Sequence, residues 1–230
     1  ILCGVSIGYY LFHPLYKPYD IESKPYWVYG LFFVLLILEF LNLKCHLILR
    51  NLRPRGTKNR GIPHGYGFNH ISCANYFYES LIWIIFSLIT NTLTGYVFSF
   101  VATTQMTIWA LKKHKNYKRE FPNYPSGTLN ENGIKDSDIL IFKDLGVQIS
   151  WRLVYVIEYL GPIIIFPFFY FCDKYVYSHT NKNKHIIQIF SLWFLLFHFI
   201  KREFESLFIH RFSNATMPII RVPINCGHYW

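Results

Sequence analysis

Residues 26–43 read YWVYGLFFVLLILEFLNL, an almost wholly apolar run in which Glu39 and Asn42 stand out near the end. The run has the length of a bilayer-crossing helix, roughly 20 residues. Trp and Tyr lie near its start, as in the interfacial belts of membrane proteins. Four further apolar stretches follow at residues 71–90, 93–111, 149–172 and 185–200. The five stretches predict an all-α, polytopic membrane helical bundle of about six to seven transmembrane helices.

The composition agrees with a membrane protein. Hydrophobic residues make up 52% of the chain and aromatic residues 20%. Charged residues make up only 16%, against about 25% in an average soluble domain. These values exclude a disordered, collagen-like or coiled-coil chain. We therefore expect residues 1–230 to form a single integral-membrane domain.

The formal net charge is +10, and the basic residues gather in two loops between predicted spans. These are Lys44, Arg50, Arg53, Arg55, Lys58 and Arg60, and then Lys112, Lys113, Lys115, Lys118 and Arg119. Two spans separate the loops, so both lie on one side, which the positive-inside rule makes cytosolic. Lys201, Arg202 and Arg211 are expected on that side too. Membrane loops and pockets for phosphorylated ligands explain such charge, so no nucleic-acid partner is expected.

The two ends of the chain are each only half a span. Residues 1–12 and 217–230 are apolar but too short to cross a bilayer, where backbone groups must be satisfied within a complete helix. Joined tail to head, residues 218–230 and 1–12 make one span of ordinary length. Residues 123–144 are polar and resemble a terminus. We therefore expect the printed order to be a rotation of the biological order, with the true ends near Ser126.

Polar side chains recur at helical spacing inside the apolar stretches, and such residues are costly at membrane depth. Four stripes are present: Glu39, Asn42, His46 and Arg50; Gln148, Arg152, Tyr155 and Tyr159, with Glu158 beside them; Glu203, Ser206, His210 and Asn214; and Asn75, Tyr76 and Glu79. A single stripe is equally well explained as polar contact between helices. Four in one small bundle favour a shared polar cavity, which would open toward the basic side.

Several chemistries lack their motifs. No GxGxxG follows a strand, and no GxxxxGK[ST] is present, so neither a Rossmann nor a P-loop nucleotide site is indicated. The ten histidines form no HxxxH or HxxHH pair. A membrane di-iron oxygenase is therefore not indicated, and we expect no metal.

Six segments resemble the trans-2-enoyl-CoA reductases of very-long-chain fatty acid elongation, which belong to the steroid 5α-reductase superfamily. They are HLILRNLRPRGTKNRGIPHGYGF (46–68), SCANYFYE (72–79), QMTIWALKKHKNYKREFPNYP (105–125), KDLGVQISWR (143–152), KREFESLFIHRFSNATMP (201–218) and NCGHYW (225–230). The family order places residues 143–230 before residues 1–125, which agrees with the rotation inferred from the half-spans. Residues 127–144 resemble the end of the ubiquitin-like domain that precedes the family's membrane domain.

The resemblance implies an activity and a location. NADPH would deliver hydride to the β-carbon of a trans-2-enoyl-CoA, a proton would reach the α-carbon, and a saturated acyl-CoA would leave. This is the last step of elongation, which also supplies sphingolipid metabolism. The protein would be a multi-pass protein of the endoplasmic reticulum membrane, with its active site toward the cytosol. Its partners would be a long-chain enoyl-CoA, the bilayer and other fatty acid elongase subunits.

The resemblance also implies roles for particular residues. Tyr76 would be the proton donor, and a Tyr with a pKa of about 10 does hold its proton at neutral pH. Gln148 and Glu158 are the other residues on which the family depends. Glu158 and His210 would face the substrate carbonyl, although His210 stands where the steroid enzymes have Tyr. NADPH would contact Asn42, His46, Arg53, Asn75, Glu79 and Tyr117. Arg50 and Arg53 also suit its phosphate oxygens, because guanidinium binds them in pairs. On spacing alone, a positive-inside loop explains these arginines equally well.

Three other interpretations stay open from the sequence. The first is an enzyme of the same fold that reduces a steroid or a polyprenol. The second is a non-catalytic membrane scaffold. The third is a channel or transporter, against which the asymmetric basic loops and the lack of an internal repeat argue.

Overall fold

The computed structural model describes residues 3–18, 25–52, 61–120, 147–178, 184–212 and 216–229. Its long helices are α2 (Pro25–Asn51), α3 (Ala74–Thr90), α4 (Leu93–Glu120), α5 (Trp151–Phe171) and α7 (Ile186–Phe204). The shorter elements are α1 (Cys3–Leu11), β1 (Gln148–Ser150), α6 (Asp173–Val176), the π-helical turn η1 (Glu205–Ile209), β2 (Thr216–Pro218), the 3-10 turn η2 (Ile219–Arg221) and α8 (Val222–Tyr229). The five long helices coincide with the five apolar stretches, so the prediction of a helical bundle is confirmed.

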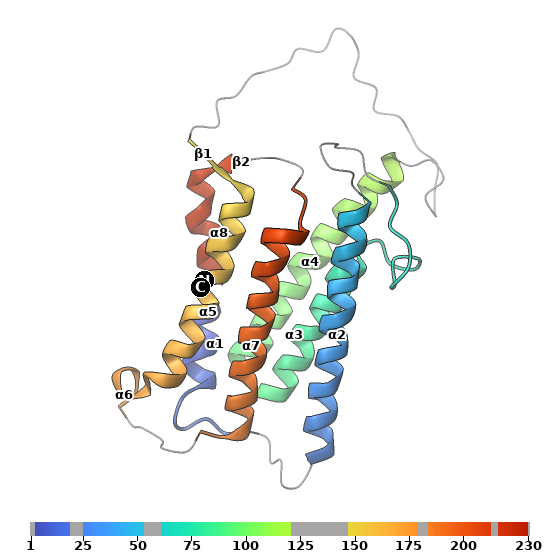
Figure 1. The fold of residues 1–230 in the computed structure, drawn as a ribbon. Coiled ribbons are helices and arrows are strands. Elements are labelled where there is room, and N and C mark those ends of the chain that lie inside the picture. Colours follow the sequence, from blue (N-terminus) through green and yellow to red (C-terminus); the bar gives the residue numbers. More distant parts are fainter. Residues whose placement is uncertain are drawn as a thin grey trace.

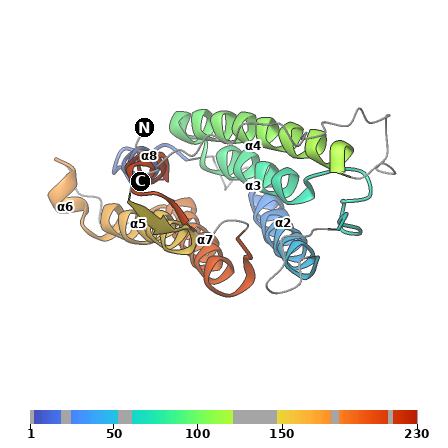
Figure 2. The same cartoon turned by 90° about the horizontal axis from the view of Figure 1, so that it is seen from above.

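The long helices run side by side, and α7 lies between α5 and α2 (Figures 1 and 2). At one end of the bundle, β1 and β2 form a two-stranded antiparallel sheet in which Gln148 pairs with Pro218. The helices α2 and α5 are each long and apolar enough to cross a membrane. The number of crossings, six to seven, stays a prediction.

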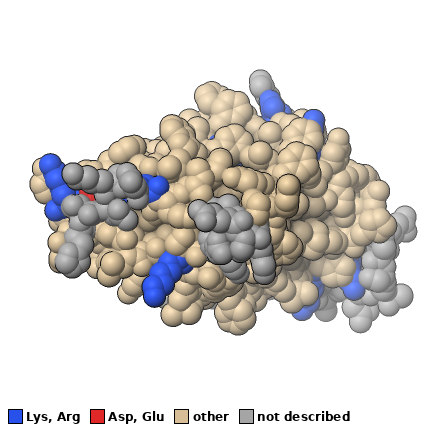
Figure 3. Space-filling model, turned by 90° about the horizontal axis from the view of Figure 1, so that it is seen from below, with Lys and Arg blue, Asp and Glu red and all other residues tan. Residues whose placement is uncertain are grey.

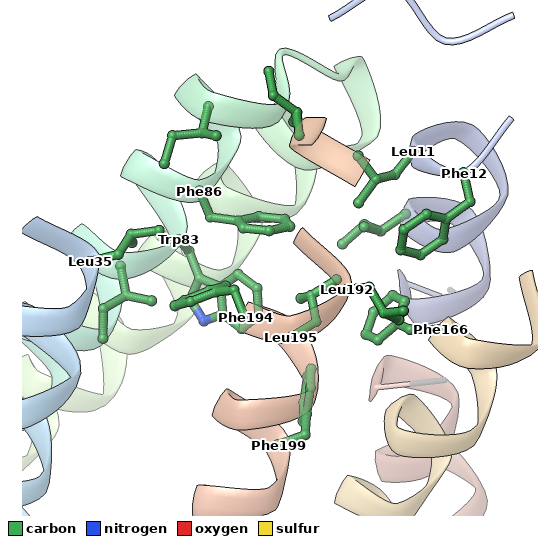
Figure 4. Packing of buried hydrophobic residues seen from close by; sticks show 14 of the residues in the cluster. Leu11, Phe12, Leu35, Trp83, Phe86, Phe166, Leu192, Phe194, Leu195 and Phe199 are labelled. Carbon is green, nitrogen blue, oxygen red and sulfur yellow. The ribbon is translucent and has the colours of Figure 1, made fainter. Parts of the chain in front are cut away.

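The buried core gathers around α7 (Figure 4). Side chains from α7 meet aromatic and aliphatic side chains of α3, α5, α2 and the segment at the end of α1. The labelled members of this core are Leu11, Phe12, Leu35, Trp83, Phe86, Phe166, Leu192, Phe194, Leu195 and Phe199. Because α7 has neighbours on opposite sides, polar residues on it are held between two halves of the bundle.

Apolar side chains also cover the outside of the bundle. On α2, Phe33, Leu36, Ile37 and Phe40 are exposed, and an apolar surface of this extent is typical of a membrane-facing helix. The face seen from below in Figure 3 carries few charged residues. Basic residues occupy the last turns of α2 and α4 at the opposite end of the bundle (Figure 1). This asymmetry agrees with the predicted charge distribution.

The half-length helices α8 and α1 occupy one column beside α5. Both pack against α5 and against each other. In Figure 1, α8 fills the upper half of the column and α1 the lower half. The arrangement agrees with the predicted joining of the two half-spans. The rotated order stays a prediction, because residues 1, 2 and 230 lie outside the described residues, as do Ser126 and the ubiquitin-like stretch at residues 127–144.

Close contact between α1 and α5 depends on Gly8. A Cβ atom added at Gly8 would lie 2.7 Å from Cδ2 of Phe169 on α5, whereas one added at Gly30 on α2 would meet nothing within 4 Å. We expect Gly8→Val to cost about 1–3 kcal/mol of folding free energy, because overpacking forces neighbouring groups apart. Thermal unfolding in detergent measures this loss, with Gly30→Val as control. Equal shifts for the two variants would contradict the contact.

Candidate functional site

The polar stripe predicted on α2 faces the interior of the bundle. Glu39, Asn42 and His46 are all buried, with exposed fractions of 2%, 0% and 6%. They follow one another at i, i+3 and i+7, so a helix places them on one face. Arg50 follows half-buried in the last turn. Arg53, which the sequence also predicts to bind the cofactor, lies outside the described residues.

His198 of α7 links two carboxylates that come from different helices. Its Nδ1 lies 2.6 Å from Glu39 Oε1 on α2, and its Nε2 lies 3.4 Å from Glu79 Oε1 on α3. Carboxylates accept hydrogen bonds, so a ring that donates from both nitrogens is an imidazolium. The ring also packs edge-on against Trp83, with 5.0 Å between centroids. His198 therefore joins α2, α3 and α7 through charge.

Lys201 extends this network to the two asparagines. Its Nζ lies 2.6 Å from Glu39 Oε2 and donates to Asn42 Oδ1 at 2.9 Å. Asn42 Nδ2 in turn donates to the backbone oxygen of Asn75 at 3.0 Å. The side-chain oxygen of Asn75 is buried and accepts no hydrogen bond from the described residues. A buried acceptor in this state is suited to a ligand that brings an N–H group.

Arg202 connects the α2 side of the site to α5. Its Nη1 donates to Glu205 Oε2 at 2.7 Å, and its Nη2 donates to the Tyr159 hydroxyl at 3.0 Å. His46 Nδ1 lies 2.9 Å from the same oxygen of Glu205. Lys201 and Arg202 both belong to α7, and both pair with buried carboxylates.

The structure corrects the first member of the predicted stripe of Glu203, Ser206 and His210. Glu205 is fully buried, with an exposed fraction of 0%, whereas Glu203 is only half-buried. The His210 N–H donates to the Glu205 carbonyl at 2.7 Å, an i+5 bond that widens the turn. Glu205 lies four residues after Lys201 and three after Arg202, so it shares the face of α7 that carries these cations. The predicted stripe followed a neighbouring face of the helix, which carries Glu203. Asn214 lies outside the described residues.

The predicted stripe on α5 is correct only in part. Glu158 and Tyr159 are buried, but Arg152 and Gln148 are exposed. Gln148 lies in β1 and not on the helix, because extended backbone continues to Ser150 and α5 begins only at Trp151. The structure therefore does not bring Gln148 to the polar interior. The missed partner of Glu158 is Asn225 of α8, whose side chain hydrogen-bonds the carboxyl group.

Tyr76 and Tyr117 lie on the α3–α4 side of the site. Tyr76 is partly buried, and its ring centroid lies 6.2 Å from that of Trp109 on α4. It precedes Glu79 by three residues, so the two are neighbours on the helix surface. Tyr117 is buried near the end of α4, and Lys113 Nζ lies 5.6 Å from its ring centroid.

Three potential metal ligands converge where α2 meets η1. Ligand atoms of His46, Glu205 and His210 lie within 4.8 Å of one another. Two histidines and a glutamate are a donor set that Zn²⁺ accepts. No local sequence motif reveals this set, because the three residues come from segments far apart in sequence. The Arg202 guanidinium already contacts two of the three side chains.

His210 lies beyond η1, outside the long helices, and its environment opposes protonation. Burial, with the positive charge of Arg202, lowers the pKa of His210 to about 3. The unfolded chain has a His pKa of about 6.5 and takes up a proton as the pH falls below that value, whereas the native protein does not. This residue therefore removes stability progressively between pH 6.5 and pH 3.

We expect His210→Gln to lessen the acid sensitivity of the fold. Between pH 7 and pH 5 the wild type should lose at most about 2 kcal/mol more folding free energy than the variant, because the unfolded variant has no imidazole to protonate. Denaturant unfolding at the two pH values measures the difference. His70→Gln, at an exposed position, should behave as the wild type does. An unchanged pH slope in His210→Gln would contradict the burial of a neutral imidazole.

Buried carboxylates and cations from four helices thus form a polar interior within an apolar bundle. The fold and this interior define a helical membrane protein with a charged centre, in which fixed charges act strongly because little water screens them. Residues 1–128 match the family described as 3-oxo-5-alpha-steroid 4-dehydrogenase, and the chain belongs to that family.

Curated relatives extend the comparison. A very-long-chain enoyl-CoA reductase of Dictyostelium discoideum is 44% identical over 124 residues, which cover 54% of this chain and 40% of the relative. A candidate enoyl reductase of Schizosaccharomyces pombe is 42% identical over 127 residues, which cover 54% of this chain and 42% of the relative. The chain thus spans about two fifths of the length of these relatives. No solved structure matches it.

Proposed function

We propose that the chain forms the membrane interior of a reductase that converts a trans-2-enoyl-CoA to a saturated acyl-CoA with NADPH. The names of the relatives support the substrate class. The observation that carries the proposal is the continuous network from Asn75 through Asn42 and Lys201 to Glu39 and His198. Buried ionisable groups such as Lys201, Glu39 and His198 are expensive in an apolar bundle and are typical of a functional interior.

The residues present fit a nicotinamide nucleotide. The buried Asn75 Oδ1, which accepts no hydrogen bond from the described residues, suits a carboxamide N–H. Cationic side chains at the cytosolic end of α2 suit phosphate oxygens. We infer that NADPH is held by Asn42, His46, Arg50, Arg53, Asn75, Glu79 and Tyr117. When bound, it supplies the hydride.

The chain's own residues supply the proton and the fixed charges. We infer that the Tyr76 hydroxyl gives its proton to the α-carbon of the substrate, since a phenol keeps its proton at neutral pH. Hydride addition to the β-carbon moves negative charge onto the thioester oxygen. Glu158 and His210 are proposed to orient that carbonyl group. Donors that are already fixed in a dry interior stabilise such charge without reorganising.

The role proposed for Gln148 needs a change in position. Gln148 is exposed on β1, so in the described arrangement it does not line the interior. We infer that it acts at the mouth of the site. Its conversion to Ala should then affect the KM for enoyl-CoA more than kcat.

The cellular setting is part of the same proposal. The asymmetry of basic residues supports an orientation with the charged end of the bundle in the cytosol. We infer that the protein resides in the endoplasmic reticulum membrane, works beside other fatty acid elongase subunits, and completes each elongation cycle that feeds sphingolipid metabolism. Long acyl chains would then lie between helices or extend into lipid.

The test is substrate choice by the purified full-length protein. We expect loss of the reduced-nicotinamide absorbance with a long-chain trans-2-enoyl-CoA and none with a 3-oxo steroid or a polyprenol. The family description names a steroid reaction, so turnover of the steroid alone would favour that second activity. A folded protein that does not oxidise NADPH with any of the three substrates would support the scaffold interpretation.

A further inference from the structure

His46, Glu205 and His210 converge as the ligands of a metal ion do. At this position, however, a side chain of the same protein supplies a cation. The ligand atoms of the three residues lie within 4.8 Å of one another. Arg202 Nη1 lies 2.7 Å from Glu205 Oε2 and 3.3 Å from His46 Nδ1. A guanidinium nitrogen therefore contacts two of the groups that a metal ion would use.

We propose that Arg202 is a built-in cation that takes the place of a metal ion at this three-residue site and fixes the spacing of the two halves of the reductase interior. The second part of this inference rests on the function proposed above. In that role Arg202 is a positioning residue, which acts through the groups that it holds.

The contacts of Arg202 explain how it could set this spacing. Its Nη2 donates to the Tyr159 hydroxyl at 3.0 Å, and its guanidinium carbon lies 5.2 Å from the Tyr159 ring centroid. Tyr159 belongs to α5, next to Glu158, whereas His46 belongs to α2. One rigid planar group thus spans from the proposed cofactor side to the proposed substrate side. Lysine could supply the charge but not this fork of donors.

The charges at the site explain why a cation is required. Glu205 is fully buried, and its other nearby cation, Lys201, is farther away, with Nζ 3.8 Å from Oε1. A buried carboxylate without a close cation is strongly disfavoured. A guanidinium keeps its charge at every physiological pH. The positive charge beside the substrate region is therefore permanent, as a bound metal ion's would be.

The first test does not depend on the reaction. If Arg202 occupies a cation position, Arg202→Ala should leave two imidazoles and a carboxylate free to bind Co²⁺, with visible d–d absorption at one ion per protein. The wild type should show none, and Arg202→Ala/His210→Ala should lose the band. Equal Co²⁺ spectra for wild type and Arg202→Ala, or no Co²⁺ bound by folded Arg202→Ala, would overturn the proposal.

The variant Arg202→Lys keeps the test decisive if Arg202→Ala does not fold. Lysine retains the charge, so this variant should fold and exclude Co²⁺. It cannot bridge Glu205 and Tyr159 together, so we expect kcat for the enoyl-CoA to fall about 10-fold to 100-fold, as for other residues that position a site. Binding of Co²⁺ by Arg202→Lys, or its full turnover, would contradict the inference.

Chemical rescue separates a positioning role from general loss of structure. Added guanidinium should restore part of the turnover of folded Arg202→Ala, whereas ammonium should not. The matched control is Arg152→Ala on exposed α5 surface, which should keep its turnover. If the wild type reduces no enoyl-CoA, the proposed function fails, and the Co²⁺ spectra still decide whether Arg202 fills a cation site.

Discussion

Replacing His198 with leucine is expected to cost about 3–5 kcal/mol of folding free energy, the usual penalty for removing one partner of a buried ion pair. His198 lies between Glu39 and Glu79, at 2.6 and 3.4 Å. Without the imidazolium, Lys201 still contacts Glu39, but Glu79 loses this close partner. Thermal and denaturant unfolding in detergent measure the loss.

Two further variants test the electrostatic cause of this loss. His198→Leu combined with Glu79→Gln should recover part of the stability, because the carboxylate left behind is then neutral. His64→Leu, which changes an exposed histidine, should shift stability by no more than about 0.5 kcal/mol. If the double variant is less stable than His198→Leu alone, repulsion between uncompensated charges is not the cause.

Replacing Tyr76 with phenylalanine is expected to reduce kcat with a long-chain enoyl-CoA by about 100-fold to 10,000-fold, the range for loss of a positioned proton donor. The change removes only a hydroxyl group from a partly buried ring that packs near Trp109. Stability should therefore change little. Steady-state oxidation of NADPH measures the effect.

The control for Tyr76→Phe is Tyr78→Phe on the same helix. Tyr78 packs against the main core, as Tyr76 does, and also against a small cluster of Cys45, Phe68 and Ala74. The proposal gives its hydroxyl no role, so turnover should not change. A solvent deuterium effect on kcat in the wild type would agree with proton transfer by Tyr76. Full activity of Tyr76→Phe would remove this residue from the mechanism.

The sequence predicts the helices and the α2 side of the interior well. Glu39, Asn42 and His46 obey the helical period, so their common face follows from spacing alone. The same reasoning fails where the backbone leaves that period. At β1 the chain is extended, which turns Gln148 outward. On α7 the period alone does not say which face meets α2, and that face carries Glu205 and not Glu203.

The remaining omissions concern partners that only the fold brings together. His198 is a single polar residue in an apolar stretch, and such a histidine is usually a hydrogen-bonded core residue. Lys201 and Arg202 are charged residues at the end of an apolar stretch. Whether their side chains point into the bundle depends on which face of α7 meets α2. Asn225 reaches Glu158 only because α8 packs on α5. Each of these contacts joins residues far apart in the chain, and local periodicity carries no information about them.

We propose that this charged interior holds a hydride donor next to an enoyl thioester. The most direct measurement is mass analysis of the acyl-CoA formed by the full-length protein from NADPH that carries deuterium at its hydride-donating carbon. We expect one deuterium at the β-carbon of the product in the wild type, and almost no labelled product from Tyr76→Phe. A folded protein that binds the nucleotide and forms no deuterated acyl-CoA would contradict the proposed reaction.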